Sequence, residues 1–273
     1  FLLSELCIDR HTVRSYFWQE EVDPVTHPHS AVITGASSGI GKALAFELAA
    51  RGYALGLASR RIARLEELRD ALLAKHPGVK VELAELDVDQ VDTVKACLDD
   101  LFTRMGGADI VVVNAGVNRF TRVGRDELAD ELQILQTNVL GAVATIQAAS
   151  AYFLSRGRGQ LVGISSLAAE NAIPKQAAYC ASKAALSMYL DIARMELSRK
   201  GIGVTTILPG FVETEIMEDI GKYPFAVSAE KAAREMADII EKGSAFGVVP
   251  AFPWKYVKPF FKVIPDAIYR KLK

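Results

Sequence analysis

From residue 30 to residue 250 the sequence alternates short apolar runs with longer amphipathic segments, and this alternation restricts the fold most. The apolar runs lie at 31–34, 53–58, 79–86, 109–114, 160–165, 203–208 and 246–250. Helical patterns lie between them, at 40–51, 61–75, 90–105, 125–155, 176–200 and 229–242. Strands that alternate with helices pair in parallel through right-handed crossovers. The pattern therefore predicts a three-layer α/β fold, a doubly wound parallel sheet of about seven strands with helices on both faces.

The size and composition are those of one large globular domain. The chain has 273 residues, of which 50% are hydrophobic and 24% charged, a balance typical of globular proteins. No linker or repeat divides residues 30–250, so we expect one domain there. An extension over residues 1–29, either a surface helix or an interaction arm, precedes it, and a tail over residues 251–273 follows. The formal net charge of −1 argues against nucleic acid as a partner.

The cysteines show no pattern typical of a metal site or of a disulfide framework. Cys7, Cys97 and Cys180 lie far apart, and the histidines lack metal-ligand spacing. We therefore expect a reducing compartment, the cytoplasm, and no bound metal. The sequence has no apolar run of about eighteen residues, so we predict no transmembrane helix.

A glycine-rich turn follows the first predicted strand and opens the first predicted helix. Residues 34–41 read TGASSGIG. The glycines allow a tight turn and let a phosphate approach the backbone at a helix N-terminus, where free N–H groups favour an anion. Glycines also occur in ordinary strand-to-helix loops, but this position favours dinucleotide binding. The candidate binding residues of the turn are Gly35, Ser37, Ser38, Gly39, Ile40 and Gly41.

Two arginines, Arg60 and Arg61, follow the second predicted strand. In a dinucleotide-binding fold this position faces the adenosine ribose, where an acid suits a free 2′-hydroxyl and an arginine suits a 2′-phosphate. The pair therefore predicts a preference for NADP(H), with NAD(H) as the alternative cofactor. The arginines could instead begin a solvated helix, and we expect one of the two to do only that.

Small and polar residues follow the third and fourth predicted strands. These are Asp87-Val88 and Asn114-Ala115-Gly116, at the strand ends where an open α/β sheet binds its ligand. Asp87 can accept a hydrogen bond from an adenine amine, and Ala115-Gly116 allows a close approach. Such residues are also common in turns without any ligand.

A tyrosine and a lysine one helical turn apart form a candidate acid/base pair. Tyr179 and Lys183 are at positions i and i+4 of a predicted helix, so both project from one face. A neighbouring ammonium favours the phenolate, which lowers the pKa of the tyrosine and lets it exchange a proton near neutral pH. The same spacing occurs on ordinary helix surfaces, so the assignment depends on the other motifs.

Together, these motifs resemble those of the short-chain dehydrogenase/reductase family. The resemblance spans residues 30–250 and includes TGASSGIG, Asp87-Val88, Asn114-Ala115-Gly116, Asn138 in TNVLG, Ser166, Tyr179-x-x-x-Lys183 and Pro209-Gly210. It implies a Rossmann fold, hydride transfer with a nicotinamide cofactor, and a homodimer or homotetramer.

The resemblance also implies residue roles. Tyr179 would be the general acid/base on the substrate oxygen, and Lys183 would lower its pKa and bind the nicotinamide ribose. Ser166, rather than Ser165, would hold the carbonyl or hydroxyl, and Asn138 would hold a water in a proton relay. The residues implied to contact the nicotinamide carboxamide are Pro209, Gly210, Val212 and Thr214.

The predicted activity is NADPH-dependent reduction of a ketone or aldehyde, or the reverse oxidation of an alcohol. The alternatives are a non-catalytic NADP(H)-binding regulator and an epimerase or dehydratase acting on nucleotide sugars. The serine, tyrosine and lysine argue against the first, and the short segment after Thr214 argues against the second.

Two segments bear on the substrate and on partners. Apolar residues between Thr214 and Ser228 would cover an apolar carbonyl compound, or would pack as a short helix on their own domain: Ile216, Met217, Ile220, Tyr223 and Phe225. The tail interleaves aromatic and basic residues, and its three spaced prolines argue against one long helix. Such a tail can contact an anionic membrane surface, but we favour packing on the domain or on a second subunit.

Overall fold

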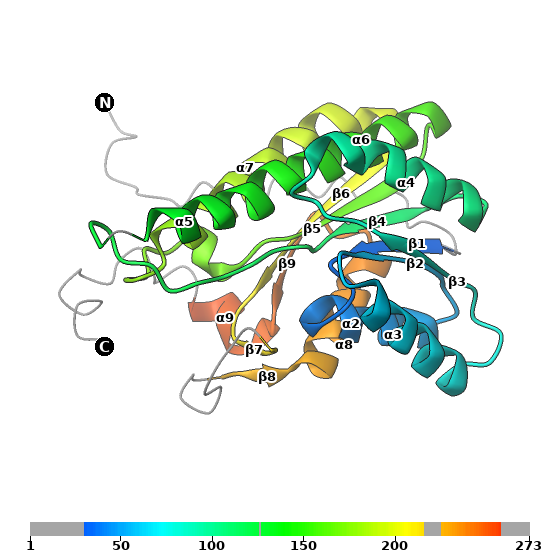
Figure 1. Cartoon of the computed structure of the whole chain (residues 1–273), viewed down its shortest axis with the longest axis horizontal. Helices are drawn as coiled ribbons and strands as arrows, with labels where there is room; N and C mark the ends of the chain where they lie inside the picture. The colour runs from blue at the N-terminus through cyan, green and yellow to red at the C-terminus, as the bar shows by residue number, and fades with distance from the viewer. Residues whose placement is uncertain (1–29, 126, 216–224, 258–273) are drawn as a thin grey trace.

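The computed structural model of the protein describes residues 30–125, 127–215 and 225–257. In this part of the chain, seven parallel strands form one sheet in the order β3-β2-β1-β4-β5-β6-β9 (Figure 1). The strands are β1 (Ser30–Thr34), β2 (Ala54–Ser59), β3 (Val81–Glu85), β4 (Ile110–Val113), β5 (Gly159–Ile164), β6 (Ile202–Pro209) and β9 (Phe246–Val249). The order reverses direction between β1 and β4, which confirms the predicted doubly wound α/β fold.

Helices cover both faces of the sheet, so the molecule has three layers (Figure 1). One face is covered by α2 (Gly39–Ala50), α3 (Ile62–Lys75) and α8 (Ala229–Glu241). The other is covered by α4 (Val91–Met105), α6 (Ala142–Arg156) and α7 (Ala177–Leu197). Central strands buried on both faces favour apolar residues along their whole length, as in β1 and β4, whereas the edge strand β3 contains Glu82 and Glu85.

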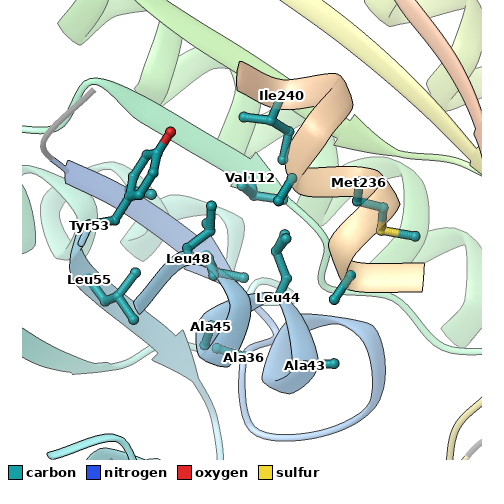
Figure 2. Close-up of a cluster of buried hydrophobic side chains, with 14 of the residues drawn as sticks. Ala36, Ala43, Leu44, Ala45, Leu48, Tyr53, Leu55, Val112, Met236 and Ile240 are labelled. Atoms are coloured by element: carbon teal, nitrogen blue, oxygen red, sulfur yellow. The ribbon is translucent and has the colours of Figure 1, made fainter. Parts of the chain in front are cut away.

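Figure 2 shows the core between α2, α8 and the sheet. Leu44 and Leu48 of α2 are fully buried against Val112 of β4 and against Met236 and Ile240 of α8. Burying a leucine side chain contributes roughly 1.5–3 kcal/mol, so this interface holds α8, and with it β9, on the domain.

The helix predicted over 125–155 differs from the structure at its centre. The structure has α5 (Leu128–Leu135), a π-helical segment (Gln136–Gly141) and then α6. Threonine, asparagine and glycine have low α-helix propensity, and π-helical turns are frequent at functional sites. A Cβ on Gly141 would lie 2.8 Å from the Val88 carbonyl oxygen, so only glycine allows this turn to pack so closely.

Three short elements were not predicted from the sequence. The two-residue strands β7 (Val212–Glu213) and β8 (Val227–Ser228) pair with each other. After β9 the chain forms α9 (Ala251–Val257), which is kinked at Phe252. The residue that precedes a proline is driven toward extended backbone angles, and Pro253 therefore explains the kink. None of the described helices has the length and apolar character needed to cross a membrane.

The predicted extension over residues 1–29 and tail residues 258–273 lie outside the described residues, as do the apolar residues at 216–224. The described start of the tail packs on the domain, because Trp254 of α9 belongs to a buried cluster with Leu167 and Leu208.

Candidate active site

The predicted site residues gather at the carboxyl edge of the sheet. All neighbouring strands are parallel, so the loops that follow β1, β2, β3, β4, β5 and β6 leave from the same edge. The topology therefore brings together motifs that are up to 180 residues apart in sequence, from Gly35 to Thr214. The edge includes the switch point between β1 and β4, where such sheets bind ligands.

The glycine-rich turn is packed tightly on the loop after β4. A Cβ on Gly35 would lie 2.7 Å from the Cα of Ala115, and one on Gly41 would lie 2.6 Å from Nδ2 of Asn114. That amide nitrogen donates to the carbonyl oxygens of Thr34 and Gly35, at 2.9 and 3.2 Å. Side chains at these glycines would therefore push the two loops apart.

The N-terminus of α2 faces the same site without a side-chain cap. Ser38 is its N-cap residue and makes no capping hydrogen bond, so the first backbone N–H groups remain open to solvent or a ligand. Gly39 has a φ of +54°, which favours glycine. Ile40 follows it and packs against the core.

The two arginines after β2 have different surroundings. Arg61 lies over the glycine-rich turn, where its guanidinium donates to Oγ of Ser37 at 2.8 Å and to Oγ of Ser38 at 2.6 Å. Arg60 is more than half exposed and lies 3.6 Å from a carboxylate oxygen of Asp89 and 3.8 Å from one of Asp87. The structure thus separates an arginine that lies over the glycine-rich turn from one that lies near Asp87 and Asp89.

The loop after β3 is fixed to the π-helical segment by Asp89, a residue that the sequence motifs did not indicate. Its carboxylate accepts hydrogen bonds from Nε2 of Gln133 and from Oγ1 of Thr137, both at 2.7 Å. Asp87 and the buried Val88 therefore lie in a loop that is held in place by hydrogen bonds to α5 and to the π-helical segment. Only tertiary contacts reveal this connection.

Asn138 is buried, and its side chain makes three hydrogen bonds. Its Oδ1 accepts from the N–H of Val117 at 2.7 Å, and its Nδ2 donates to the Val117 carbonyl at 2.9 Å and to Oγ of Ser182 at 3.1 Å. A Cβ on Gly116 would lie 3.2 Å from this Oδ1 and 3.5 Å from Nζ of Lys183. Gly116, Asn138 and Lys183 therefore meet at one point.

The two serines after β5 point into different surroundings. Ser165 is buried, and its hydroxyl donates to the Lys183 carbonyl at 3.0 Å and is 2.7 Å from that of Ser187. Ser166 is partly exposed, its hydroxyl accepts a hydrogen bond from the N–H of Ala168 at 3.1 Å, and its nearness to Tyr179 acts to lower the pKa of the phenol. The geometry thus supports Ser166 as the serine of the site and gives Ser165 a structural contact with α7.

Tyr179 and Lys183 lie one turn apart on α7, as the spacing predicted. The ammonium of Lys183 is 5.9 Å from the Tyr179 ring centroid and donates to the Ile164 carbonyl at 3.0 Å. Burial lowers the pKa of Lys183 to about 8. Burial also raises the pKa of Tyr179 above its ordinary value, although the hydrogen bond to Ser166 opposes that shift.

The raised pKa corrects the expectation that Lys183 lowers the pKa of the phenol. In the free protein, desolvation of the phenolate raises this pKa and outweighs the hydrogen bond from Ser166, which acts in the opposite direction. The consequence is that Tyr179 holds its proton at neutral pH.

The segment after β6 crosses the glycine-rich turn. A Cβ on Gly39 would lie 3.3 Å from the methyl group of Thr214, so this threonine and the turn are in contact. Pro209 ends β6, Gly210 donates to the Val249 carbonyl at 2.7 Å, and Val212 is buried. Of the predicted residues of this segment, Thr214 therefore lies beside the predicted phosphate turn, whereas Pro209 and Gly210 lie against the end of β9.

The comparisons with known proteins agree with this geometry. A family model described as short chain dehydrogenase matches residues 29–223. An uncharacterized oxidoreductase of Myxococcus xanthus is 40% identical over 243 residues, which are 88% of this chain and 94% of the relative. The 11-beta-hydroxysteroid dehydrogenase 1A of Arabidopsis thaliana is 38% identical over 70% of this chain and 54% of its own length.

Solved structures show the same fold. An alcohol dehydrogenase from the archaeon Thermococcus sibiricus, complexed with 5-hydroxy-NADP, is 28% identical and has a TM-score of 0.72 over 81% of this chain and 94% of its own. Levodione reductase, 23% identical, superposes with a TM-score of 0.75 over 81% of this chain and 95% of its own. The sequence motifs, the sheet order and these relatives lead to one conclusion: the chain belongs to the short-chain dehydrogenase/reductase family of Rossmann-fold oxidoreductases, which use a nicotinamide cofactor.

Proposed function

We propose that the protein reduces a ketone or aldehyde with NADPH, and oxidises the corresponding alcohol in the reverse direction. The observation that carries this proposal is the grouping of Ser166, Tyr179 and Lys183 at the carboxyl edge of the sheet, beside the Gly116 loop. Kinetics of the Tyr179→Phe variant, described in the Discussion, test it.

The cofactor would supply the hydride to the carbonyl carbon. Ser166 would donate a hydrogen bond to the substrate oxygen, which becomes negative as the carbon is reduced. Tyr179 would transfer its proton to that oxygen, since the phenol carries that proton at neutral pH. Lys183 would return a proton to the tyrosinate, with Asn138 holding the water that connects the pair to solvent.

The residues present fit an NADP cofactor. Side chains at Gly35 and Gly41 would collide with Ala115 and Asn114, so only glycine fits at these two positions. The turn therefore presents its backbone, which is what a pyrophosphate would approach. Asp87 and Ala115 would flank the adenosine, and Arg61, Ser37 and Ser38, which are hydrogen-bonded together, would offer one cation and two hydroxyls to a 2′-phosphate.

We expect Arg61→Ala to weaken NADPH binding by about tenfold to a hundredfold, the range for loss of charge-assisted hydrogen bonds, and to leave NADH binding nearly unchanged. Arg60→Ala is the matched control, because the Arg60 guanidinium lies near Asp87 and Asp89. This variant should lose much less affinity for NADPH. Fluorescence titration of each variant with both cofactors measures the effect. Equal losses for NADPH and NADH in Arg61→Ala would mean that this arginine does not bind the 2′-phosphate.

We propose an apolar substrate. Phe211 and Phe225 both pack on Trp254, whose buried cluster includes Leu167, the residue after Ser166. Phe225 is 57% exposed, so it can contact a ligand. We also propose a reducing compartment, the cytoplasm, since Cys97 and Cys180 are free thiols.

We propose that the protein is a homodimer or homotetramer that uses the adjacent helices α5 and α7. Leu128, Leu132 and Leu135 form an exposed stripe on α5, and an exposed stripe on α7 consists of Met188, Ile192 and Met195. Both follow the i, i+4, i+7 spacing of one helix face, and exposed apolar patches of this kind mark interfaces.

Replacing Ile192 by glutamate is expected to shift the protein to a monomer, because a charge buried without a partner opposes association. Light scattering after size exclusion gives the mass directly. Leu73→Glu, on the exposed side of α3, is the control and should keep the oligomer. A wild-type protein that elutes as a monomer, or an Ile192→Glu variant that keeps the oligomer, would contradict this interface.

A further inference from the structure

Trp254, on the helix after the last strand, packs beneath two parts of the proposed site. It is only 6% exposed and shares a buried cluster with Leu167 and Leu208. Leu167 directly follows Ser166, the proposed substrate-binding serine. The indole also packs edge-on against Phe211, with 5.6 Å between ring centroids, and against Phe225, with 5.9 Å.

The indole also limits the position of Gly210. A Cβ on this glycine would lie 2.7 Å from Nε1 of Trp254, so the backbone of Gly210 lies directly against the ring. The N–H of Gly210 donates to the carbonyl of Val249 at 2.7 Å. The glycine backbone is therefore held between the end of β9 and the indole, and any larger residue would displace one of them.

The position of Trp254 is fixed from α8. Oε2 of Glu235 on α8 accepts a hydrogen bond from the N–H of Ala251 at 2.9 Å, at the first residue of α9. The segment that carries Trp254 is thus connected at Ala251 to α8, which packs on α2 in the core.

We propose that Trp254 is a positioning residue that sets the backbone of Gly210 and Phe211 for contact with the nicotinamide end of the cofactor. This role rests on the proposed function of the segment from Pro209 to Thr214. Trp254 makes no contact with the reacting atoms in this role. It acts because a rigid indole fixes the loop, and a shift of about 1 Å at a positioned group can cost about a hundredfold in rate.

The test separates the two halves of the cofactor. Trp254→Ala, Trp254→Phe and the control Phe252→Ala are each titrated with NADPH and with adenosine 2′,5′-bisphosphate, which lacks the nicotinamide half. Phe252 is a suitable control because it is 74% exposed and packs on Tyr256, away from Gly210. Emission of bound NADPH reports the nicotinamide environment, and calorimetry measures the bisphosphate.

We expect Trp254→Ala to raise the Kd for NADPH about tenfold, equivalent to about 1.4 kcal/mol, with less than about a twofold change for the bisphosphate. Trp254→Phe should raise the Kd for NADPH less than Trp254→Ala does, and Phe252→Ala should leave the Kd for both ligands unchanged. Unchanged NADPH binding in the alanine variant, or equal losses of both ligands, would overturn the role. If Trp254→Ala does not fold, Trp254→Phe is the deciding variant. Its Kd for NADPH should rise more than its Kd for the bisphosphate, and equal changes would overturn the role. A wild-type protein that binds neither ligand would instead overturn the proposed function itself.

Discussion

Replacing Tyr179 by phenylalanine is expected to lower turnover by about a thousandfold while leaving NADPH binding intact, since general acid catalysis contributes about 10²–10⁴. The substitution removes only the phenol oxygen, which hydrogen-bonds Ser166, and keeps the ring beside Lys183. The phenylalanine ring carries no proton that it could donate to the substrate oxygen. The measurement is NADPH consumption with a panel of apolar ketones and aldehydes.

Tyr189→Phe is the matched control for this variant. It lies on the same helix, α7, and its hydroxyl accepts a hydrogen bond from Gln147 at 2.6 Å, away from the site. It should keep wild-type turnover. Full activity in Tyr179→Phe would disprove the acid/base assignment, whatever the control does.

Replacing Lys183 by methionine is expected to stabilise the free protein at pH 7, even though it weakens cofactor binding and turnover. The buried ammonium has a pKa of about 8, compared with 10.5 for an ordinary lysine, which corresponds to about 3 kcal/mol. The lost hydrogen bond to the Ile164 carbonyl offsets about 1 kcal/mol of this. A gain of about 1–2 kcal/mol in unfolding free energy therefore follows.

The gain should depend on pH in one direction. Below pH 8 both the folded and the unfolded chain hold the lysine proton, so the buried charge destabilises the wild type by the full amount. Between pH 8 and 10.5 the unfolded chain binds more protons than the folded one, so wild-type stability rises and the advantage of methionine shrinks. Lys95→Met, at a mostly exposed lysine, is the control and should change little. Denaturant unfolding at pH 7 and pH 9.5 measures the difference, and a destabilised methionine variant at pH 7 would contradict the account.

The sheet could be predicted because its central strands are local apolar runs. Buried parallel strands need apolar residues on both faces, so the runs at 31–34 and 160–165 identify β1 and β5 without tertiary information. The alternation with amphipathic helices then sets the parallel topology. The π-helical segment at Gln136–Gly141 was not predicted, because its packing against Val88 depends on a loop about fifty residues earlier in the sequence.

Only those residues of the candidate site that belong to short sequence motifs could be predicted. Arg60 and Arg61 are equivalent in sequence, and only the fold shows that Arg61 faces Ser37 while Arg60 faces Asp87. Asp89 and Trp254 were missed because their roles arise from contacts with distant elements. The pKa of Tyr179 was predicted in the wrong direction, since the sequence shows the neighbouring lysine but not the burial of both groups.

The most direct test of the central claim is a titration of the purified protein with NADPH and NADH side by side, following cofactor fluorescence. The titration needs no substrate. Cofactor binding depends on the glycine-rich turn, on Arg61 and on the segment that contains Gly210, so the measurement tests all three. NADPH should bind at least about tenfold more tightly, the difference that about 1.4 kcal/mol of 2′-phosphate contacts would give. Tighter binding of NADH, or binding of neither cofactor, would contradict an NADPH-dependent reductase.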